Sequence, residues 1–226
     1  IYTGEDTLSL HDALPILGYS NQSLIGFQTI DGVDKYFGAG NRFSVVNIGV
    51  AIPLTFGATK AAMVCGITGA VTFNVVANSG PYNEQFILDS IAGTSVVKTI
   101  TYNGTGNTIA FSSTNSNERA VIKLNGADYI TFDSLTIDSR GAGTFGYGVQ
   151  LINNADTNTF RKSTILVSET STSANFAGIV INAVAAGTIG LGNTWCDGNK
   201  FDNNTISGGF YGATLVGSST QLITSN

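Results

Sequence analysis

Charged side chains are scarce in this chain of 226 residues, in which Asp, Glu, Lys and Arg together make up 11%. The formal net charge is −5. A chain with an acidic excess lacks the basic surface that binds phosphates, so we expect no nucleic-acid partner. Hydrophobic residues account for 42%. The low charge therefore does not indicate disorder, which goes with low hydrophobicity and high net charge.

Long apolar runs, cysteine and histidine are also nearly absent. No run approaches the roughly 20 apolar residues that span a bilayer, so we expect no membrane insertion. The two cysteines, Cys65 and Cys196, are too few for a disulfide framework or a zinc site. We favour two buried thiols, which pack as small apolar groups, over a disulfide. We expect no metal and no cofactor.

The only histidine, His11, lies in a segment of unusual origin. Residues 1–16 resemble one reading frame of a common short-read sequencing adapter, with Gly4-Glu5-Asp6 in the place of an index barcode. We therefore leave this segment out of the fold prediction, as one would a tag. Without it the chain has 12 acidic and 10 basic residues, a net charge of −2. A genuine amphipathic leader is the alternative.

What is present is a repeat. An aliphatic run is followed by an Asn/Gly/Asp turn, a short strand ending in an aromatic residue, and then Leu or Thr with Ile. It occurs in residues 121–137, 149–166, 179–206 and 213–223. Three short strands per unit predict an all-β, single-stranded, right-handed parallel β-helix.

Aligning the repeats on their aromatic residue gives three columns of inward-facing side chains. They are Leu124/Leu151/Ile181/Leu215, Phe132/Phe160/Phe201/Ile223 and Ile137/Ile165/Ile206. Because stacked strands lie about 4.8 Å apart, equivalent residues should sit directly above one another. The longer intervals between repeats predict loops at Ser139–Gly146, Ser168–Ala177 and Ala183–Gly198.

The rest of the chain divides around this β-helix. Residues 17–65 read as an irregular N-terminal region with short strands at 23–30 and 35–37. Its last part, 43–65, has some helical character and is expected to cap the core. The β-helix is expected over 66–226, with first strands at 71–76, 86–88, 98–102 and 108–111, and to be truncated at its C-terminus. We expect a monomer within a longer chain.

Several motifs carry a family resemblance from about Cys65 onward. They are Val71-Thr-Phe-Asn-Val75, Pro81-Tyr-Asn-Glu-Gln85, Ser90-Ile-Ala-Gly-Thr-Ser95, residues 123–132 and Asn203-Asn-Thr-Ile206. The pattern resembles the pectin-lyase-like superfamily, and more narrowly the β-helix region of large bacterial surface proteins exported by type IX secretion. This resemblance implies a secreted or cell-surface protein whose partner is an extracellular polysaccharide or other glycan.

Catalytic chemistry is weakly represented. Enzymes of this fold that act on acidic polysaccharides use carboxylates with calcium and an Arg or Lys base, or two to three carboxylates for hydrolysis. The sequence has no Asp-Asp pair, no Gly-His-Gly or Arg-x-Lys motif, and no histidine after residue 16. We name no catalytic residue. A non-catalytic stalk or adhesin is the favoured function, and a polysaccharide lyase or glycoside hydrolase with an incomplete active site is the alternative.

Asp133, Arg161 and Asp202 follow the aromatic residue in three successive repeats. They are candidates for a sugar-binding groove, but an alternating charge ladder between stacked strands is the favoured interpretation. Asp128 and Asp156 lie in Asn-rich turns, where a turn role is favoured over calcium binding. Asn158 and Asn199 are expected to cap a bend with stacked side-chain amides.

Three aromatic residues complete the candidate ligand-binding set. Trp195, the only tryptophan, lies in a predicted loop. An exposed position would make it a platform for a sugar ring, whereas the favoured interpretation folds it back over the coil. Tyr147 and Tyr211 precede Gly148 and Gly212 at equivalent places, and we expect them to form a surface aromatic pair.

Overall fold

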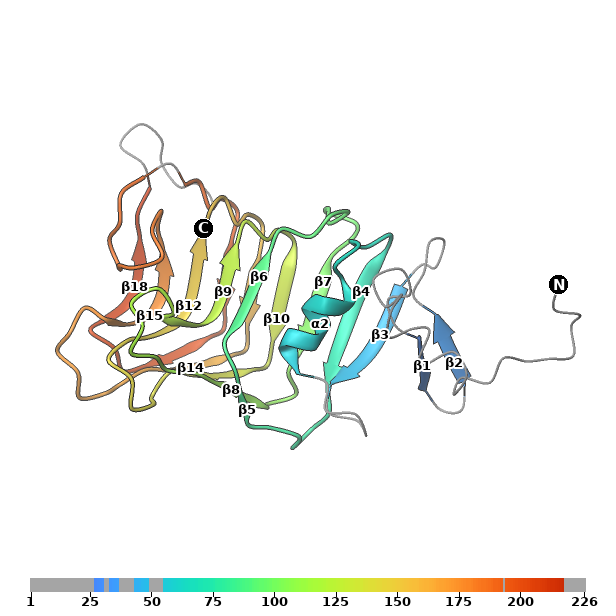
Figure 1. Cartoon of the computed structure of the whole chain (residues 1–226), viewed down its shortest axis with the longest axis horizontal. Helices are drawn as coiled ribbons and strands as arrows, with labels where there is room; N and C mark the ends of the chain where they lie inside the picture. The colour runs from blue at the N-terminus through green and yellow to red at the C-terminus, as the bar shows by residue number, and fades with distance from the viewer. Residues whose placement is uncertain (1–26, 31–32, 37–42, 49–54, 193, 218–226) are drawn as a thin grey trace, which may run out of the picture.

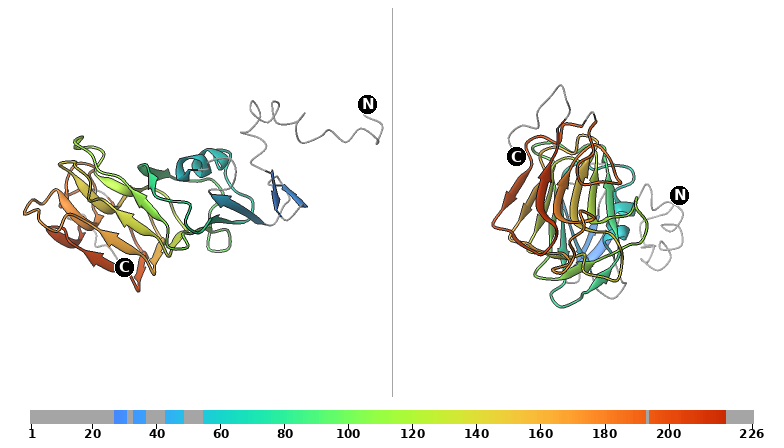
Figure 2. Two further views of the ribbon diagram at one scale, coloured as in Figure 1. Left: turned by 90° about the horizontal axis from the view of Figure 1, so that it is seen from below. Right: turned by 90° about the vertical axis from the view of Figure 1, so that its left-hand side faces the viewer.

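The computed structural model describes residues 27–30, 33–36, 43–48, 55–192 and 194–217. They form a right-handed parallel β-helix whose turns advance along one axis (Figure 1). Three parallel sheets run the length of this solenoid, as Figure 2 also shows from two other directions. The fold class predicted from the repeat is confirmed.

From β4 onward each turn gives one strand to each sheet, and the first sheet also contains β3. The first sheet has the order β16-β13-β10-β7-β4-β3, with bounds Lys200–Asp202, Thr159–Arg161, Ile130–Asp133, Ile100–Asn103, Ala70–Val75 and Phe43–Ile48. The second is β17-β14-β11-β8-β5, with bounds Thr205–Ser207, Thr164–Leu166, Thr136–Asp138, Thr108–Ala110 and Tyr82–Asn83. The third is β18-β15-β12-β9-β6, with bounds Tyr211–Leu215, Phe176–Ile181, Gly146–Ile152, Ala120–Asn125 and Phe86–Asp89.

The first sheet begins earlier than the sequence indicated. Residues 43–48, assigned to the cap, form strand β3, which pairs in parallel with β4. Upstream, β1 (Phe27–Ile30) and β2 (Val33–Tyr36) form an antiparallel pair. The segment Phe43-Ser-Val-Val-Asn-Ile48 is rich in aromatic and β-branched residues, as strands are, and our prediction merged it with the helical residues that follow.

The helical part of the expected cap is α2 (Phe56–Ala62). The Thr55 hydroxyl accepts a hydrogen bond from the Ala58 amide at its N-terminus. The Glu84 carboxylate accepts two more, from the amides of Phe56 and Gly57 at 2.8 and 2.9 Å. This carboxylate also stabilises the positive end of the helix dipole.

Helix α2 packs its buried side onto the aromatic core. The Phe56 ring lies 5.4–5.8 Å from those of Tyr82, Phe86 and Tyr102. The Thr59 hydroxyl is 2.9 Å from the Tyr102 hydroxyl, so this buried phenol has a hydrogen-bond partner. The helix thus covers apolar side chains of the first two turns.

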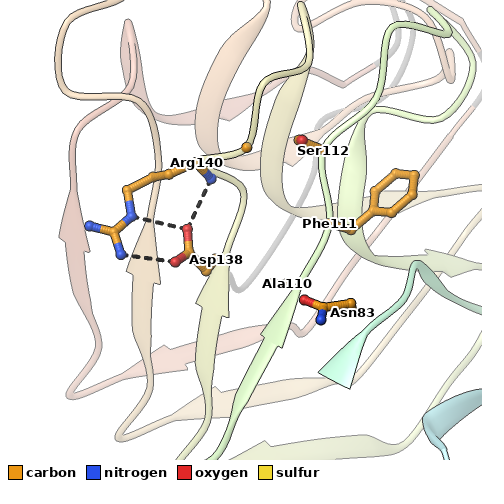
Figure 3. Close-up of a pocket in the computed structure, with 7 residues that line it drawn as sticks. Asn83, Ala110, Phe111, Ser112, Asp138 and Arg140 are labelled. Atoms are coloured by element: carbon orange, nitrogen blue, oxygen red, sulfur yellow. Dashed lines mark hydrogen bonds and ion pairs between the residues drawn. The ribbon is translucent and has the colours of Figure 1, made fainter. Parts of the chain in front are cut away.

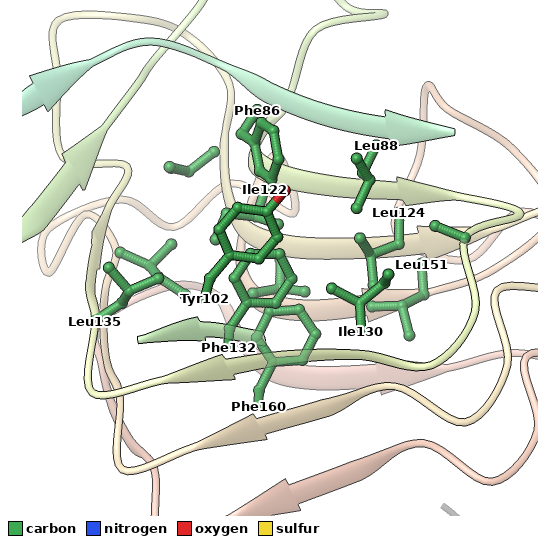
Figure 4. Packing of buried hydrophobic residues seen from close by; sticks show 14 of the residues in the cluster. Phe86, Leu88, Tyr102, Ile122, Leu124, Ile130, Phe132, Leu135, Leu151 and Phe160 are labelled. Atoms are coloured by element: carbon green, nitrogen blue, oxygen red, sulfur yellow. The ribbon is translucent and has the colours of Figure 1, made fainter. Parts of the chain in front are cut away.

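A column of stacked rings runs through the interior (Figure 4). The centroid distances are 5.0 Å for Phe73–Tyr102, 5.1 Å for Tyr102–Phe132, 4.9 Å for Phe132–Phe160 and 5.6 Å for Phe160–Phe201. All four pairs have interplanar angles of 20° or less. Such stacking adds about 0.5–1.5 kcal/mol per pair to the burial of each ring.

The predicted columns have the predicted register. Phe132 pairs with Phe160 and Phe160 with Phe201, and the leucine and isoleucine columns align equally. Burial falls only in the last described turn, where Leu215 is 52% exposed. Ile223 lies outside the described residues.

The bend between the first and second sheets is made the same way in three turns. Ser134, Lys162 and Asn203 directly follow the first-sheet strand, and each has a φ between 52° and 56°. A left-handed residue at this place bends the chain between two strands that are separated by two residues. Asn tolerates this conformation, and the Ser134 and Lys162 amides each donate to a carbonyl of the next turn, Arg161 and Asp202 respectively.

The predicted loops connect strands as expected, and one of them covers an outer face. The loop after β15 lies over the third sheet, where the Gln150 amide donates to the Val184 and Ala185 carbonyls. The Thr214 hydroxyl donates to the Thr188 carbonyl. Strands β12 and β15 are therefore buried on both faces.

We predict that Phe132→Ala lowers the free energy of unfolding by about 3–5 kcal/mol, because it leaves a cavity between two stacked rings. Thr131→Ala, at the neighbouring outward position of β10, is the matched control and should change stability by less than about 0.5 kcal/mol. Urea denaturation of both variants checks this. Similar losses in the two variants would show that the inward and outward faces of β10 are wrongly assigned.

Candidate functional site

The register places the charged candidates side by side on the outer face of the first sheet. Asp133 pairs with Arg161 and Arg161 with Asp202 on adjacent strands. The Arg161 Nε and Nη2 atoms each lie 2.7 Å from Asp133 Oδ2. The Asp202 carboxylate accepts a hydrogen bond from the Asn203 amide at 3.1 Å.

The Asp133–Arg161 contact behaves as a structural ion pair. Burial alone would raise the pKa of Asp133, but hydrogen bonds from Ser134 and Arg161 hold it below its ordinary value. The Arg161 side chain is 44% exposed, so the pair contributes at most about 1 kcal/mol to stability. This geometry supports the ladder interpretation over a groove.

A second column of carboxylates lies in the turns before the first sheet. Asp128 Oδ1 accepts a hydrogen bond from the Asp156 amide, and Asp156 Oδ1 from the Asp197 amide, both at 2.7 Å. Burial raises the pKa of Asp128 and of Asp156, and the neighbouring carboxylates raise that of Asp156 further. The favoured turn role agrees with these contacts.

Asn158 and Asn199 cap the adjacent bend. Asn158 Nδ2 donates to Asn199 Oδ1 at 3.1 Å and to the Ala127 carbonyl at 2.8 Å, and its own oxygen accepts from the Ile130 amide. Both side chains are fully buried. The predicted amide stacking is confirmed.

A similar ladder at the next bend was not predicted. The Ser163 hydroxyl accepts from the Leu135 amide, and Asn204 Oδ1 accepts from the Ser163 amide at 3.0 Å. Asn107 has the equivalent role two turns before Ser163, accepting from the Ser79 and Gly80 amides. The sequence signal was the polar residue directly before Thr-Ile at Asn107, Ser163 and Asn204, whereas Leu135 lies at this place in the turn between Asn107 and Ser163.

The expected surface pair of tyrosines is not formed. Tyr147 and Tyr211 occupy one column, as predicted, but Ala177 lies between them. Tyr147 is fully buried, and its hydroxyl accepts a hydrogen bond from Arg119 Nη1 at 3.0 Å. Tyr211 is partly buried against this cluster. The prediction failed because the loops before β9 and β15 cover the outer face at this point.

Trp195 is folded back against the coil and only partly exposed. Its backbone amide donates to Asn154 Oδ1, and its buried indole nitrogen has no hydrogen-bond partner among the described residues. Such a position agrees with the favoured interpretation and offers little ring face to a sugar. Cys196, next to it, is buried, whereas Cys65 is exposed and does not form a disulfide with it.

One pocket lies where the second sheet meets its loops (Figure 3). Its volume is about 350 Å³, and its lining residues are Asn83, Ala110, Phe111, Ser112, Asp138, Arg140 and Gly141. Arg140 is held by Asp138 through Nε at 3.0 Å and Nη2 at 2.8 Å. This ion pair keeps the pKa of Asp138 below and that of Arg140 above the ordinary value.

The outer faces of the first and second sheets are rich in hydroxyl groups. Threonines align as Thr72/Thr101/Thr131/Thr159 on the first sheet and as Thr108/Thr136/Thr164/Thr205 on the second. Within the described ranges, no group of three or more His, Cys, Asp or Glu side chains is placed to hold a metal ion.

We predict that Asp156→Asn makes the protein more stable at pH 7. The native carboxyl holds its proton to higher pH than the unfolded chain does, so this residue destabilises the fold as pH rises above 3.8. An amide keeps the bond from Asp197 without the charge. Thermal unfolding at several pH values should show the gain shrinking as the pH falls toward 3.8 and vanishing below it. A gain independent of pH would contradict this assignment.

Asn158→Ala should lower the free energy of unfolding by at least about 2 kcal/mol, because buried backbone groups lose their partners. Asn83→Ala, at an exposed position of β5, is the control and should have little effect. Chemical denaturation of both variants tests the buried amide ladder. Equal stability of the two variants would overturn it.

We compared the chain with protein families, curated proteins and solved structures. No family model, no curated protein and no solved structure matches the chain significantly. Among the described residues, the structure has no helix of the length and apolarity needed to cross a bilayer. The function therefore has to be argued from the site.

Proposed function

We propose that this chain is a non-catalytic stalk or adhesin module of a secreted or cell-surface protein, and that it contacts glycans. The proposal includes membership of the pectin-lyase-like β-helices and export by type IX secretion. Both rest on the sequence motifs described above. The fold supports the proposal, because a solenoid of stacked turns presents long, regular surfaces.

The observation that carries the proposal is that the carboxylates are engaged in structural contacts. Asp133 is paired with Arg161 and Asp138 with Arg140. Asp89 is paired with Lys60 and also accepts a hydrogen bond from Asn125. Asp128 and Asp156 each bind a backbone amide of the next turn. A hydrolase of this fold needs carboxylates that are positioned around a substrate instead.

The lyase alternative requires a basic side chain that is deprotonated near neutral pH, so that it can accept a proton from the substrate. In the pocket the only such candidate is Arg140, and its contact with Asp138 raises the pKa of the guanidinium. A more strongly held proton is the opposite of what proton abstraction needs. The pocket therefore favours binding over elimination.

We expect the purified chain to bind polysaccharide without cleaving it. Affinity electrophoresis in gels that contain a β-glucan, a xylan, a mannan or polygalacturonate measures the binding. Reducing-end release and the absorbance of unsaturated uronates measure hydrolysis and elimination. Retardation without product supports the module. Sustained product release would establish an enzyme, and absence of binding to the whole panel would remove the glycan contact.

A further inference from the structure

The second sheet carries two neighbouring outward columns that run along the solenoid axis. One is Thr108/Thr136/Thr164/Thr205, and the other is Asn83/Ala110/Asp138/Leu166/Ser207. Adjacent rungs repeat at about 4.8 Å, which is close to the length of one sugar residue in an extended chain. A linear polymer lying along this face would meet a threonine hydroxyl on four of the five strands.

The pocket is lined by Asn83, Ala110 and Asp138 of the second column and is bordered by two loops that meet. At Gly141 a Cβ atom would lie 1.9 Å from the Ser112 hydroxyl and 2.8 Å from the Ser112 Cβ atom, so any larger residue would force Ser112 to shift where the loop after β11 meets the loop after β8. The Phe111 ring, partly buried against the core, lines the same space. The Asn83 amide lies on the opposite side from Arg140 (Figure 3).

The charge in the pocket is balanced. Asp138 accepts hydrogen bonds from Arg140 Nε and Nη2, which leaves three of the five guanidinium N–H groups for a ligand. The charge of Glu169 also acts on Arg140. A net positive pocket would attract uronates, whereas this one has donors and acceptors without excess positive charge.

We propose that the pocket anchors a neutral polysaccharide whose chain runs along the threonine column of the second sheet. Its hydroxyl groups would bond to the Asn83 amide, the Ser112 hydroxyl and the outer edge of Arg140. A few placed polar groups beside an apolar wall are typical of small-molecule sites. This assignment rests on the proposed glycan contact and adds its location and the class of sugar.

The first test blocks the pocket without touching the core. Ala110→Trp places a bulky ring on the pocket floor, and Thr101→Trp places the same ring at an outward position of the first sheet in the same turn. Affinity electrophoresis with a β-glucan, a xylan and a mannan should show that Ala110→Trp abolishes retardation while Thr101→Trp retains it. Circular dichroism verifies that both variants fold.

The second test uses a matched pair of arginines. Arg140 and Arg161 have 45% and 44% exposed side chains, and each is paired with one aspartate. Arg140→Ala should weaken neutral-polysaccharide binding about tenfold, since charge-assisted hydrogen bonds are lost. Arg161→Ala should leave the affinity unchanged.

The outcomes separate the two proposals. If Arg161→Ala or Thr101→Trp abolishes binding and the pocket variants do not, the glycan lies on the first sheet, and only the site assignment fails. Tighter binding to polygalacturonate than to the neutral polymers would overturn the neutral class. If the unaltered chain binds none of the polymers, the proposed function fails together with its site.

Discussion

The structure depends on one constraint, which is that parallel strands of successive turns pair in register. Each backbone ladder sets adjacent turns about 4.8 Å apart, so every side chain lies directly above its equivalent. Inward positions then have to accept a like neighbour, and the flat rings from Phe73 to Phe201 do so by stacking. The same constraint decides which polar residues are tolerated at the bends.

At those bends the stacked polar groups satisfy one another. A buried amide such as Asn158 costs free energy unless its donors and acceptor are all engaged, and the turns before and after it supply the partners. Carboxylates follow the same rule in the column of Asp128, Asp156 and Asp197. Much of the polar chemistry that resembled a site in the sequence thus serves to hold the turns together.

The features that depend on the repeat itself could be predicted from the sequence. The aromatic and aliphatic columns followed from the spacing alone, because a period fixes which residues stack. The stacking of Asn158 on Asn199 followed for the same reason. Strand β3 was missed because Phe43–Ile48 precedes the recognisable repeats and adjoins a helical stretch.

Features that depend on the loops were not predictable. The burial of Tyr147 results from Arg119 and the covering loops, and nothing in the repeat indicates it. The pocket joins Ser112 and Gly141 from different turns, and their contact depends on loop conformations that have no period. Loops vary independently of the turns that carry them, so a solenoid can acquire a binding site without altering its core.

The most direct test of the register is a pair of double-mutant cycles on the aromatic column. Phe132 and Phe160 are stacked at 4.9 Å, whereas Phe160 separates Phe132 from Phe201. With leucine substitutions, the coupling free energy of unfolding should be about 0.5–1.5 kcal/mol for Phe132 with Phe160. It should be near zero for Phe132 with Phe201. Equal coupling in the two cycles, or none in the first, would contradict the stacked register.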